Sequence, residues 1–203
     1  MKKGFTLVEL LVVVGIIAVM MGILMTGFGK APQKAEIAKC SELVKNTETA
    51  LAALFEQNGA WPKCLINNNN SSRGLDETAA YPLASQIGMS LSYDTGMKKL
   101  KGLDKFGIVT PWAAAVIKNR GESCSESDRV PIGGTIADHR LCYAIDLDGD
   151  GVIKNVNPGA TVPDLKGSDR KSVSIRATAA VWCRGPKGVL IKSWTDGQTK
   201  DVN

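Results

Sequence analysis

The feature that most constrains this chain is an apolar run near its N-terminus. From Phe5 to Phe28 there are 24 residues, and Glu9 is the only charged one among them. As a helix rising about 1.5 Å per residue, the run would extend about 36 Å, more than a hydrocarbon core of about 30 Å. The lysines at positions 2 and 3 predict a cytoplasmic N-terminus. We therefore predict a transmembrane helix over residues 5–29, with the rest of the chain outside the inner membrane.

Two properties of the run distinguish it from an ordinary secretory signal. It is longer than the apolar part of a typical signal peptide, and no Ala-x-Ala-like cleavage site follows it. It also contains the Glu9 carboxylate, and an unpaired charge inside a membrane helix is unfavourable, although less so near the interface. We therefore expect Glu9 to have a cationic partner.

The start of the chain resembles the class III signal of type IV prepilins and type II secretion pseudopilins, in the order Lys-Lys-Gly4-Phe5-Thr6-Leu7-Val8-Glu9. The resemblance implies that a prepilin peptidase removes residues 1–4 by cutting after Gly4, and that the new N-terminal Phe5 is methylated. The apolar helix would then become the core of a filament.

Filament packing would give Glu9 its partner. The carboxylate of one subunit can pair with the Phe5 amine of a neighbour, and any other axial register would leave a charge unpaired. The alternative is a plain membrane anchor from which Glu9 reaches the interface.

A second helix is predicted after a cluster of helix-weakening residues. Gly22, Gly27, Gly29 and Pro32 mark either a bend in one long helix, as the resemblance implies, or an ordinary linker. Apolar residues then recur at three- and four-residue spacing from Ala35 to Phe55. This period predicts an amphipathic helix over residues 33–57, which ends at Asn58-Gly59.

The remainder of the chain predicts an antiparallel sheet. Residues 67–74 are polar and indicate an exposed loop, residues 78–89 a short helix, and residues 112–117 a short helix or strand. Strands are expected over 140–145, 173–177, 179–183 and 189–194, with a hairpin turn at 185–188. The fold class is therefore α+β. The resemblance implies a pilin fold, in which a long N-terminal helix packs on a C-terminal antiparallel sheet within a soluble periplasmic domain over residues 30–203.

An acidic segment is the clearest candidate for a binding site. Asp146, Asp148 and Asp150 occupy the first, third and fifth places of a loop, with Gly151 in the sixth place and the carbonyl of Val152 in the next ligand position. This spacing lets three carboxylates converge on one hard cation, so we predict calcium as a cofactor. Asn157 stands where an EF-hand has its bidentate Glu, which excludes an EF-hand. Asn155 or Asp164 could add ligands, and a metal-free Asp-Gly turn is the alternative.

The resemblance to pseudopilins also implies a calcium site. Major pseudopilins of type II secretion have a calcium site in a loop of the C-terminal domain. The closing hairpin also looks like theirs, but Cys183 and Lys187 replace the family's Ser and Asp, so we do not expect this hairpin to bind the metal.

Five cysteines stand at positions 40, 64, 124, 142 and 183. Outside the inner membrane cysteines tend to oxidise, and an odd number leaves at least one unpaired. We name Cys124 with Cys142 and Cys64 with Cys183 as possible disulfides, and a fully reduced set as the alternative. The single His139 and the absence of a Cys-x-x-Cys motif argue against zinc.

Composition excludes other classes of function. The basic residues that give the chain a net charge of +5 are scattered along the sequence. Nucleic-acid binding needs a concentrated basic surface, so we predict none. Signatures of serine hydrolases, phosphate loops and zinc proteases are absent, so we predict no enzymatic activity.

The resulting hypothesis is a pseudopilin of a type II secretion system, which drives protein export from a periplasmic pseudopilus. Its expected partners are further copies of the chain, the prepilin peptidase, the inner-membrane assembly platform and minor pseudopilins. The alternatives are a type IV pilin of a surface filament, for adhesion or motility, and a membrane-tethered calcium-binding domain that does not polymerise.

Overall fold

The computed structural model describes residues 6–28, 31–83, 93–94, 99–100, 106–162, 165 and 167–201. The chain divides into two compact units, Met1–Ala38 and Lys39–Asn203. The boundary falls within the second helix, so the helix predicted over 33–57 contributes to both units.

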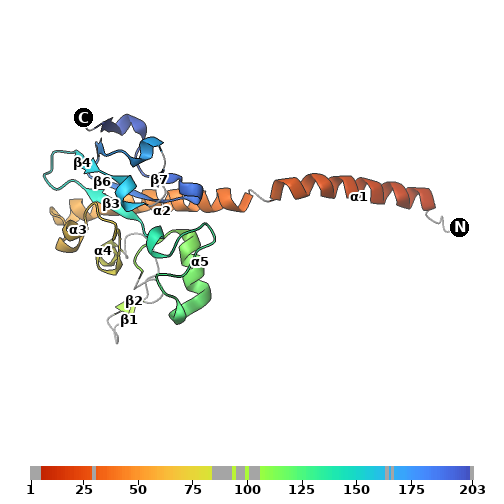
Figure 1. Ribbon diagram of the computed structural model, residues 1–203, viewed down its shortest axis with the longest axis horizontal. Helices are drawn as coiled ribbons and strands as arrows, with labels where there is room; N and C mark the ends of the chain where they lie inside the picture. Colours follow the sequence, from red (N-terminus) through yellow and green to blue (C-terminus); the bar gives the residue numbers. More distant parts are fainter. Residues whose placement is uncertain are drawn as a thin grey trace. The chain divides into compact units, whose positions relative to one another are not determined.

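The first unit contains helix α1, which spans Leu7–Phe28 (Figure 1). Every residue from 6 to 22 is exposed, including large apolar side chains such as Leu7 and Val19. Over the described residues, no helix combines the length and the apolar character that crossing a membrane requires. The predicted span over 5–29 includes residues outside the described ones and stays a prediction.

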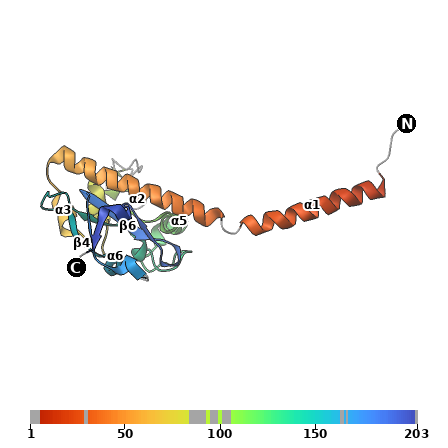
Figure 2. The same ribbon diagram turned by 90° about the horizontal axis from the view of Figure 1, so that it is seen from above.

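Helix α2 spans Ala31–Asn58, close to the predicted bounds. Pro32 is its second residue, where a missing amide proton breaks no helical hydrogen bond. Within the second unit, one face of α2 is buried at three- and four-residue spacing, through Cys40, Val44, Thr47, Ala50, Leu51 and Leu54. This face packs on the central sheet, which lies between α2 and α6 in Figure 2.

The central sheet has the order β3-β6-β7 and is antiparallel throughout. Strand β3 spans Cys142–Ile145, β6 spans Ala179–Arg184 and β7 spans Leu190–Lys192. Every residue of β3 and β6 is buried, because α2 covers one face and a second layer covers the other. These strands confirm three of the predicted segments.

The second layer contains the sheet β4-β5-β8 and a short helix. Strand β4 spans Ile153–Val156, β5 spans Val173–Ile175, β8 spans Thr199–Asp201, and α6 spans Pro158–Thr161. Trp182 of β6 and Trp194 face this layer and meet edge to face with ring centroids 5.7 Å apart, and Trp182 Nε1 donates to Thr161 Oγ1 of α6 at 2.8 Å. Strand β5 was predicted, whereas β4 and β8 were not.

Short elements connect the helices to the sheets. They are α3 (Lys63–Asn67), α4 (Glu77–Ala80), β1 (Tyr93–Asp94), β2 (Lys99–Leu100), α5 (Pro111–Arg120) and the 3₁₀ turns η1 (Tyr81–Leu83), η2 (Gly121–Ser123), η3 (Ala137–His139), η4 (Gly167–Arg170), η5 (Pro186–Gly188) and η6 (Asp196–Gln198). Residues 112–117, which were predicted as a short helix or strand, belong to helix α5. The helix predicted over 78–89 is present as α4 and η1, and its last residues lie outside the described ones. The predicted turn at 185–188 corresponds to η5.

Candidate functional site

The start of α1 is closed by a reciprocal pair of hydrogen bonds between Thr6 and Glu9. The amide and the hydroxyl of Thr6 donate to Glu9 Oε2 at 2.9 and 2.8 Å, and the amide of Glu9 donates to Thr6 Oγ1 at 3.3 Å. This is a capping box, which satisfies amides that have no partner within the helix. Glu9 thus has a role within its own chain, which the sequence prediction did not include. The Thr-x-x-Glu pattern before an apolar run could have revealed it.

The predicted processing site lies just before this cap. Gly4 and Phe5 are outside the described residues, so the cleavage and the methylation stay predictions. Glu9 itself is exposed on α1, where another molecule can reach its carboxylate.

The acidic loop joins β3 to β4, and Asp146 organises its backbone. The amide of Gly149 donates to Asp146 Oδ1 at 2.9 Å, and that of Gly151 donates to Oδ2 at 2.7 Å. Gly149 and Gly151 have φ of 74° and 77°, a region that other residues rarely adopt. The sharp turn predicted at Gly151 is therefore present, and Asp146 is the buried member of the three aspartates.

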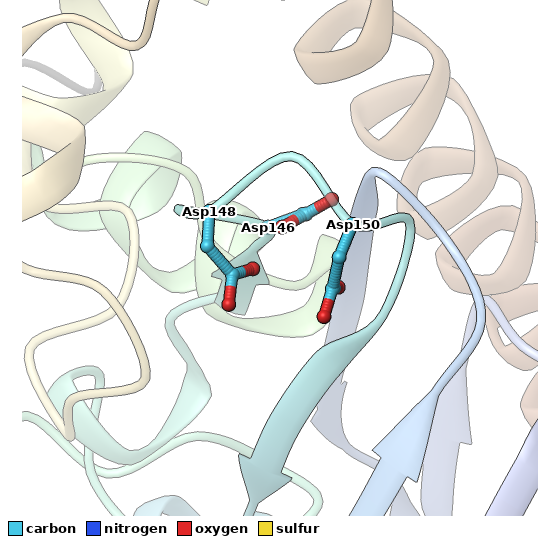
Figure 3. A group of neighbouring side chains, drawn as sticks. All are labelled: Asp146, Asp148 and Asp150. Carbon is cyan, nitrogen blue, oxygen red and sulfur yellow. The ribbon is translucent and has the colours of Figure 1, made fainter.

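The other two aspartates share a cation from their own chain. Their carboxyl groups point the same way in Figure 3, and Lys154 Nζ lies 2.7 Å from Asp148 Oδ2 and 2.6 Å from Asp150 Oδ2. The hydrogen bond from Lys154 lowers the pKa of Asp148, and the hydrogen bonds to Asp148 and Asp150 raise the pKa of Lys154. The sequence prediction did not assign Lys154 a role.

The three carboxylates nevertheless fit a calcium ion. One ligand oxygen from each of Asp146, Asp148 and Asp150 lies within 4.8 Å of the others. Oxygens that bind one calcium at about 2.3–2.6 Å are at most about 5.2 Å apart, so this spacing suits a shared ion. The ammonium of Lys154 would have to leave, and its side chain is about half exposed, 54%. Backbone carbonyls and water would supply the remaining ligands.

The other ligands predicted for the calcium site are Val152, Asn155 and Asp164. Val152 contacts the group through its amide, which donates to Asp150 Oδ1 at 2.9 Å, so its carbonyl as a ligand stays a prediction. The carbonyl of Asn155 accepts a hydrogen bond from Asn70. Asp164 lies outside the described residues.

Residues far away in the sequence hold the loop in place. Trp61 Nε1 donates to the carbonyl of Asp146 at 2.6 Å, and Asn69 Oδ1 accepts from the amide of Ile145 at 2.9 Å. On the other side, Asn70 Nδ2 donates to the carbonyl of Asn155 at 2.9 Å. The prediction of an exposed loop at 67–74 was therefore wrong for Asn68 to Asn70, which are half-buried, and for Gly74, which is buried. Asn69 and Asn70 provide the contacts with β3 and β4.

The structure does not contain the two disulfides named from the sequence. All five cysteines lie within the described residues, and no disulfide joins Cys124 to Cys142 or Cys64 to Cys183. The sulfur of Cys183 instead lies 2.9 Å from that of Cys40. Spacing along the chain could not reveal this contact, because it joins a helix to a strand that follows far later.

Comparison with known proteins gives a short motif and distant relatives. A family model for the prokaryotic N-terminal methylation motif matches residues 1–25. The type IV major pilin protein PilE1 of Neisseria gonorrhoeae is 25% identical over 75 residues, which cover 37% of this chain and 42% of that protein. The type IV major pilin protein PilE of the same species is 24% identical over 80 residues, 39% of this chain and 45% of that protein.

A fimbrial protein of Neisseria meningitidis serogroup A is 25% identical over 75 residues, 37% of this chain and 41% of that protein. The chain thus spans less than half of the length of these curated relatives. No solved structure matched the chain significantly. The chain thus carries the methylation motif at its start and is similar to type IV pilins over part of its length.

Proposed function

We propose that this chain is a structural subunit of a type IV pilin-like filament, with α1 as the assembling helix. The observation that carries the proposal is the exposure of α1. Residues 7–22 of this helix are almost all apolar, and each of them is exposed, with Leu7 at 80% and Ile17 at 48%. An apolar surface of this extent needs lipid or other protein to cover it. A membrane before assembly and neighbouring α1 helices afterwards would meet that need.

The capping box sharpens the role of Glu9 in this filament. In the isolated chain the carboxylate already accepts two hydrogen bonds from Thr6, so its charge is partly satisfied before assembly. A neighbour's Phe5 amine would then add an ion pair to a carboxylate that the cap holds at the start of the helix. Two interactions, one within the chain and one between chains, can therefore be separated by substitution.

Glu9→Gln and Glu9→Ala provide the test. Gln can still close a capping box but carries no charge, whereas Ala can do neither. If the charge pairs with a neighbour's amine, both variants should be cleaved after Gly4, and both should give at least about tenfold less filament, because a lost buried ion pair costs several kcal/mol. Mass spectrometry reports cleavage and methylation, and sedimentation of sheared filaments reports assembly.

Thr6→Ala is the matched control, since it removes the cap and keeps the charge. It should weaken the start of the helix by about 1 kcal/mol and leave assembly largely intact. Normal filaments from Glu9→Gln would refute the intersubunit pair. A wild-type chain that is cleaved but never polymerises would refute the filament.

Within this class, we propose a pseudopilin of a type II secretion system. The support is the acidic loop, whose three carboxylates fit a calcium ion and which resembles the calcium loop of major pseudopilins. The printed names of the curated relatives, which are major pilins and a fimbrial protein, favour the second candidate, a type IV pilin of a surface filament.

Deletion of the gene separates the two candidates. A pseudopilin is needed for release of exported proteins into the medium, and at native expression it leaves no filaments on the surface of intact cells. A surface pilin gives such filaments, and its loss leaves secretion unchanged. Immunogold labelling of intact cells and protein analysis of the medium distinguish these outcomes.

We further propose that the acidic loop binds calcium through Asp146, Asp148 and Asp150. The ion would replace the Lys154 ammonium as the partner of the two exposed aspartates and stabilise the turn between β3 and β4. Because Lys154 competes for the same oxygens, Lys154→Gln should tighten calcium binding, by about tenfold if both of its exposed ion pairs must be broken and each is worth up to about 1 kcal/mol. Asp148→Asn should weaken it.

Isothermal titration calorimetry of the purified full chain in detergent measures both changes, with magnesium as the competing ion. Lys192→Gln is the control, because Lys192 pairs with Asp196 away from the loop, and it should leave calcium affinity unchanged. Calcium that neither binds nor raises the melting temperature of wild type and Lys154→Gln would remove the site. Calcium binding by a chain that never forms filaments would instead favour a tethered calcium-binding domain.

A further inference from the structure

One contact between α2 and the central sheet joins two cysteines. Cys40 and Cys183 are 143 residues apart in the sequence, and their sulfurs lie 2.9 Å apart. Both side chains are completely buried. Cys40 lies on the buried face of α2, one residue after the start of the second unit at Lys39, and Cys183 lies in the middle strand β6.

The sheet geometry selects Cys40 over the other buried cysteine near Cys183. Neighbouring residues of a strand point to opposite faces, and residues paired across a ladder share a face. Cys142 is paired with Trp182, and both belong to the cluster that packs on the second layer. Cys183 therefore faces the opposite way, toward α2, so the sheet backbone separates its side chain from that of Cys142.

We propose that Cys40 and Cys183 form a disulfide that fastens α2 to strand β6. A disulfide has its sulfurs about 2.05 Å apart, so the observed separation needs to shrink by about 0.9 Å, which small side-chain rotations can provide. The oxidant is an organic disulfide, either a small molecule or a disulfide-bearing protein. One thiolate attacks it to give a mixed disulfide, the second thiolate displaces the remaining half, and two thiols leave with the two protons.

Burial determines when this reaction takes place. Burial raises the pKa of Cys183 well above its ordinary value, and the neighbouring Cys40 raises it further, so the folded chain has little thiolate for exchange. The bond therefore forms while the chain folds, before α2 closes over the sheet. The disulfide rests on the proposed function only for its periplasmic location, because the periplasm is oxidising and the cytosol is not.

The disulfide would fix the point where α2 joins the compact unit. A link at Cys40 holds the first buried turn of α2. Local unfolding that begins at the N-terminal end of the helix would therefore end at Cys40. Amide hydrogen exchange should then show slower exchange in residues 41–48 when the bond is formed, because these amides can open only with the sheet.

Refolding of the purified full chain tests the bond without reference to any compartment. The chain is unfolded in detergent and denaturant, refolded in oxidised and reduced glutathione, alkylated and digested for mass spectrometry. We expect a peptide that joins Cys40 to Cys183, and a melting temperature about 10 °C above that of the reduced chain, since the bond closes a very long loop. Cys40→Ala and Cys183→Ala should each abolish this difference.

Cys64→Ala is the matched control, because Cys64 is half-buried in α3, and it should retain the full difference. Alkylation of both Cys40 and Cys183 in the refolded wild type, or a link from Cys183 to Cys142 or Cys64, would overturn the proposal. If the Cys40–Cys183 link forms and no filament does, the proposed function fails and the disulfide stands. Filaments built from chains in which both thiols are alkylated would support the proposed function and refute the disulfide.

Discussion

At the scale of single residues, the buried His139 shows how a tertiary contact sets a protonation state. Trp112 Nε1 donates to His139 Nδ1 at 2.6 Å, and His139 Nε2 lies 2.7 Å from the carbonyl of Gly133. An indole N–H can only donate, so Nδ1 must accept and the ring proton is on Nε2. Burial lowers the pKa of His139, and the charge of Arg184 acts in the same direction, against the opposing effects of the Gly133 carbonyl and the Asp138 charge.

This arrangement predicts a loss of stability in mild acid. An unfolded histidine gains a proton near pH 6.5, whereas the native ring keeps its lowered pKa and stays neutral. The unfolded state then binds more protons than the native state. The stability is complete above about pH 6.5 and should fall as the pH decreases from there, by up to about 1.4 kcal/mol per pH unit. Denaturant unfolding between pH 5 and pH 8 measures the slope.

Because His139 is the single histidine of the chain, one substitution serves as the control. His139→Gln should be less stable above about pH 6.5, by about 2 kcal/mol for the lost buried hydrogen bonds. Its profile should be flatter, so the difference from wild type should shrink as the pH falls. A wild-type profile as flat as that of His139→Gln would contradict the assignment.

At the scale of elements, the acidic loop between β3 and β4 depends on backbone conformations that side chains disfavour. Gly151 has φ of 77°, and a Cβ at this position would meet nothing within 4 Å. Its conformation alone therefore requires glycine. Lys187 and Asn155 adopt similar φ values of 57° without being glycine, which shows that one such residue can be tolerated in a turn.

Gly151→Ala should accordingly lower the free energy of unfolding by about 1 kcal/mol through backbone strain. Gly197→Ala is the matched control, because Gly197 also has open space around it but no left-handed φ, and its effect should stay within about 0.5 kcal/mol. Chemical denaturation of both variants without calcium gives the comparison. Equal effects would show that the strain argument is wrong.

At the scale of the whole second unit, one buried hydroxyl connects α2 to two strands. Ser193 Oγ donates to Glu48 Oε1 of α2 at 2.9 Å and accepts from the amide of Val181 in β6 at 3.1 Å. Ser193 is nearly inaccessible, at 1% exposed. Its removal therefore leaves a buried amide of the central strand without this acceptor.

Ser193→Ala should destabilise the protein by about 2 kcal/mol, since an unsatisfied buried polar group costs about 1–3 kcal/mol. Thr49→Ala is the control, because the Thr49 hydroxyl bonds only to Lys45 of its own helix on the exposed side, and its effect should be about 0.5 kcal/mol or less. Thermal unfolding monitored by circular dichroism measures both. A Ser193→Ala variant as stable as wild type would contradict the role of Ser193 as a link.

The features predicted correctly are those with a local signature. The period of the apolar residues marked α2, the alternation of apolar segments and turns marked β3, β5, β6 and β7, and the Asp-Gly spacing marked the loop with its turn at Gly151. Each of these features depends on residues that are close together in the sequence, where steric limits and the burial of one face dictate the conformation. The opening motif likewise consists of consecutive residues, and the match to the N-terminal methylation motif covers residues 1–25.

Contacts between distant segments were decided only by the tertiary structure. Asn69 and Asn70 as the contacts of β3 and β4, and Cys40 in place of Cys64 beside Cys183, have no signature in the sequence. A polar side chain or a thiol carries the same local preferences whichever partner it meets, so its partner is set by the packing of α2 and the sheets. The sequence indicated the apolar N-terminal helix and the acidic loop, and the folded chain determined the contacts that close the start of the helix and hold the loop.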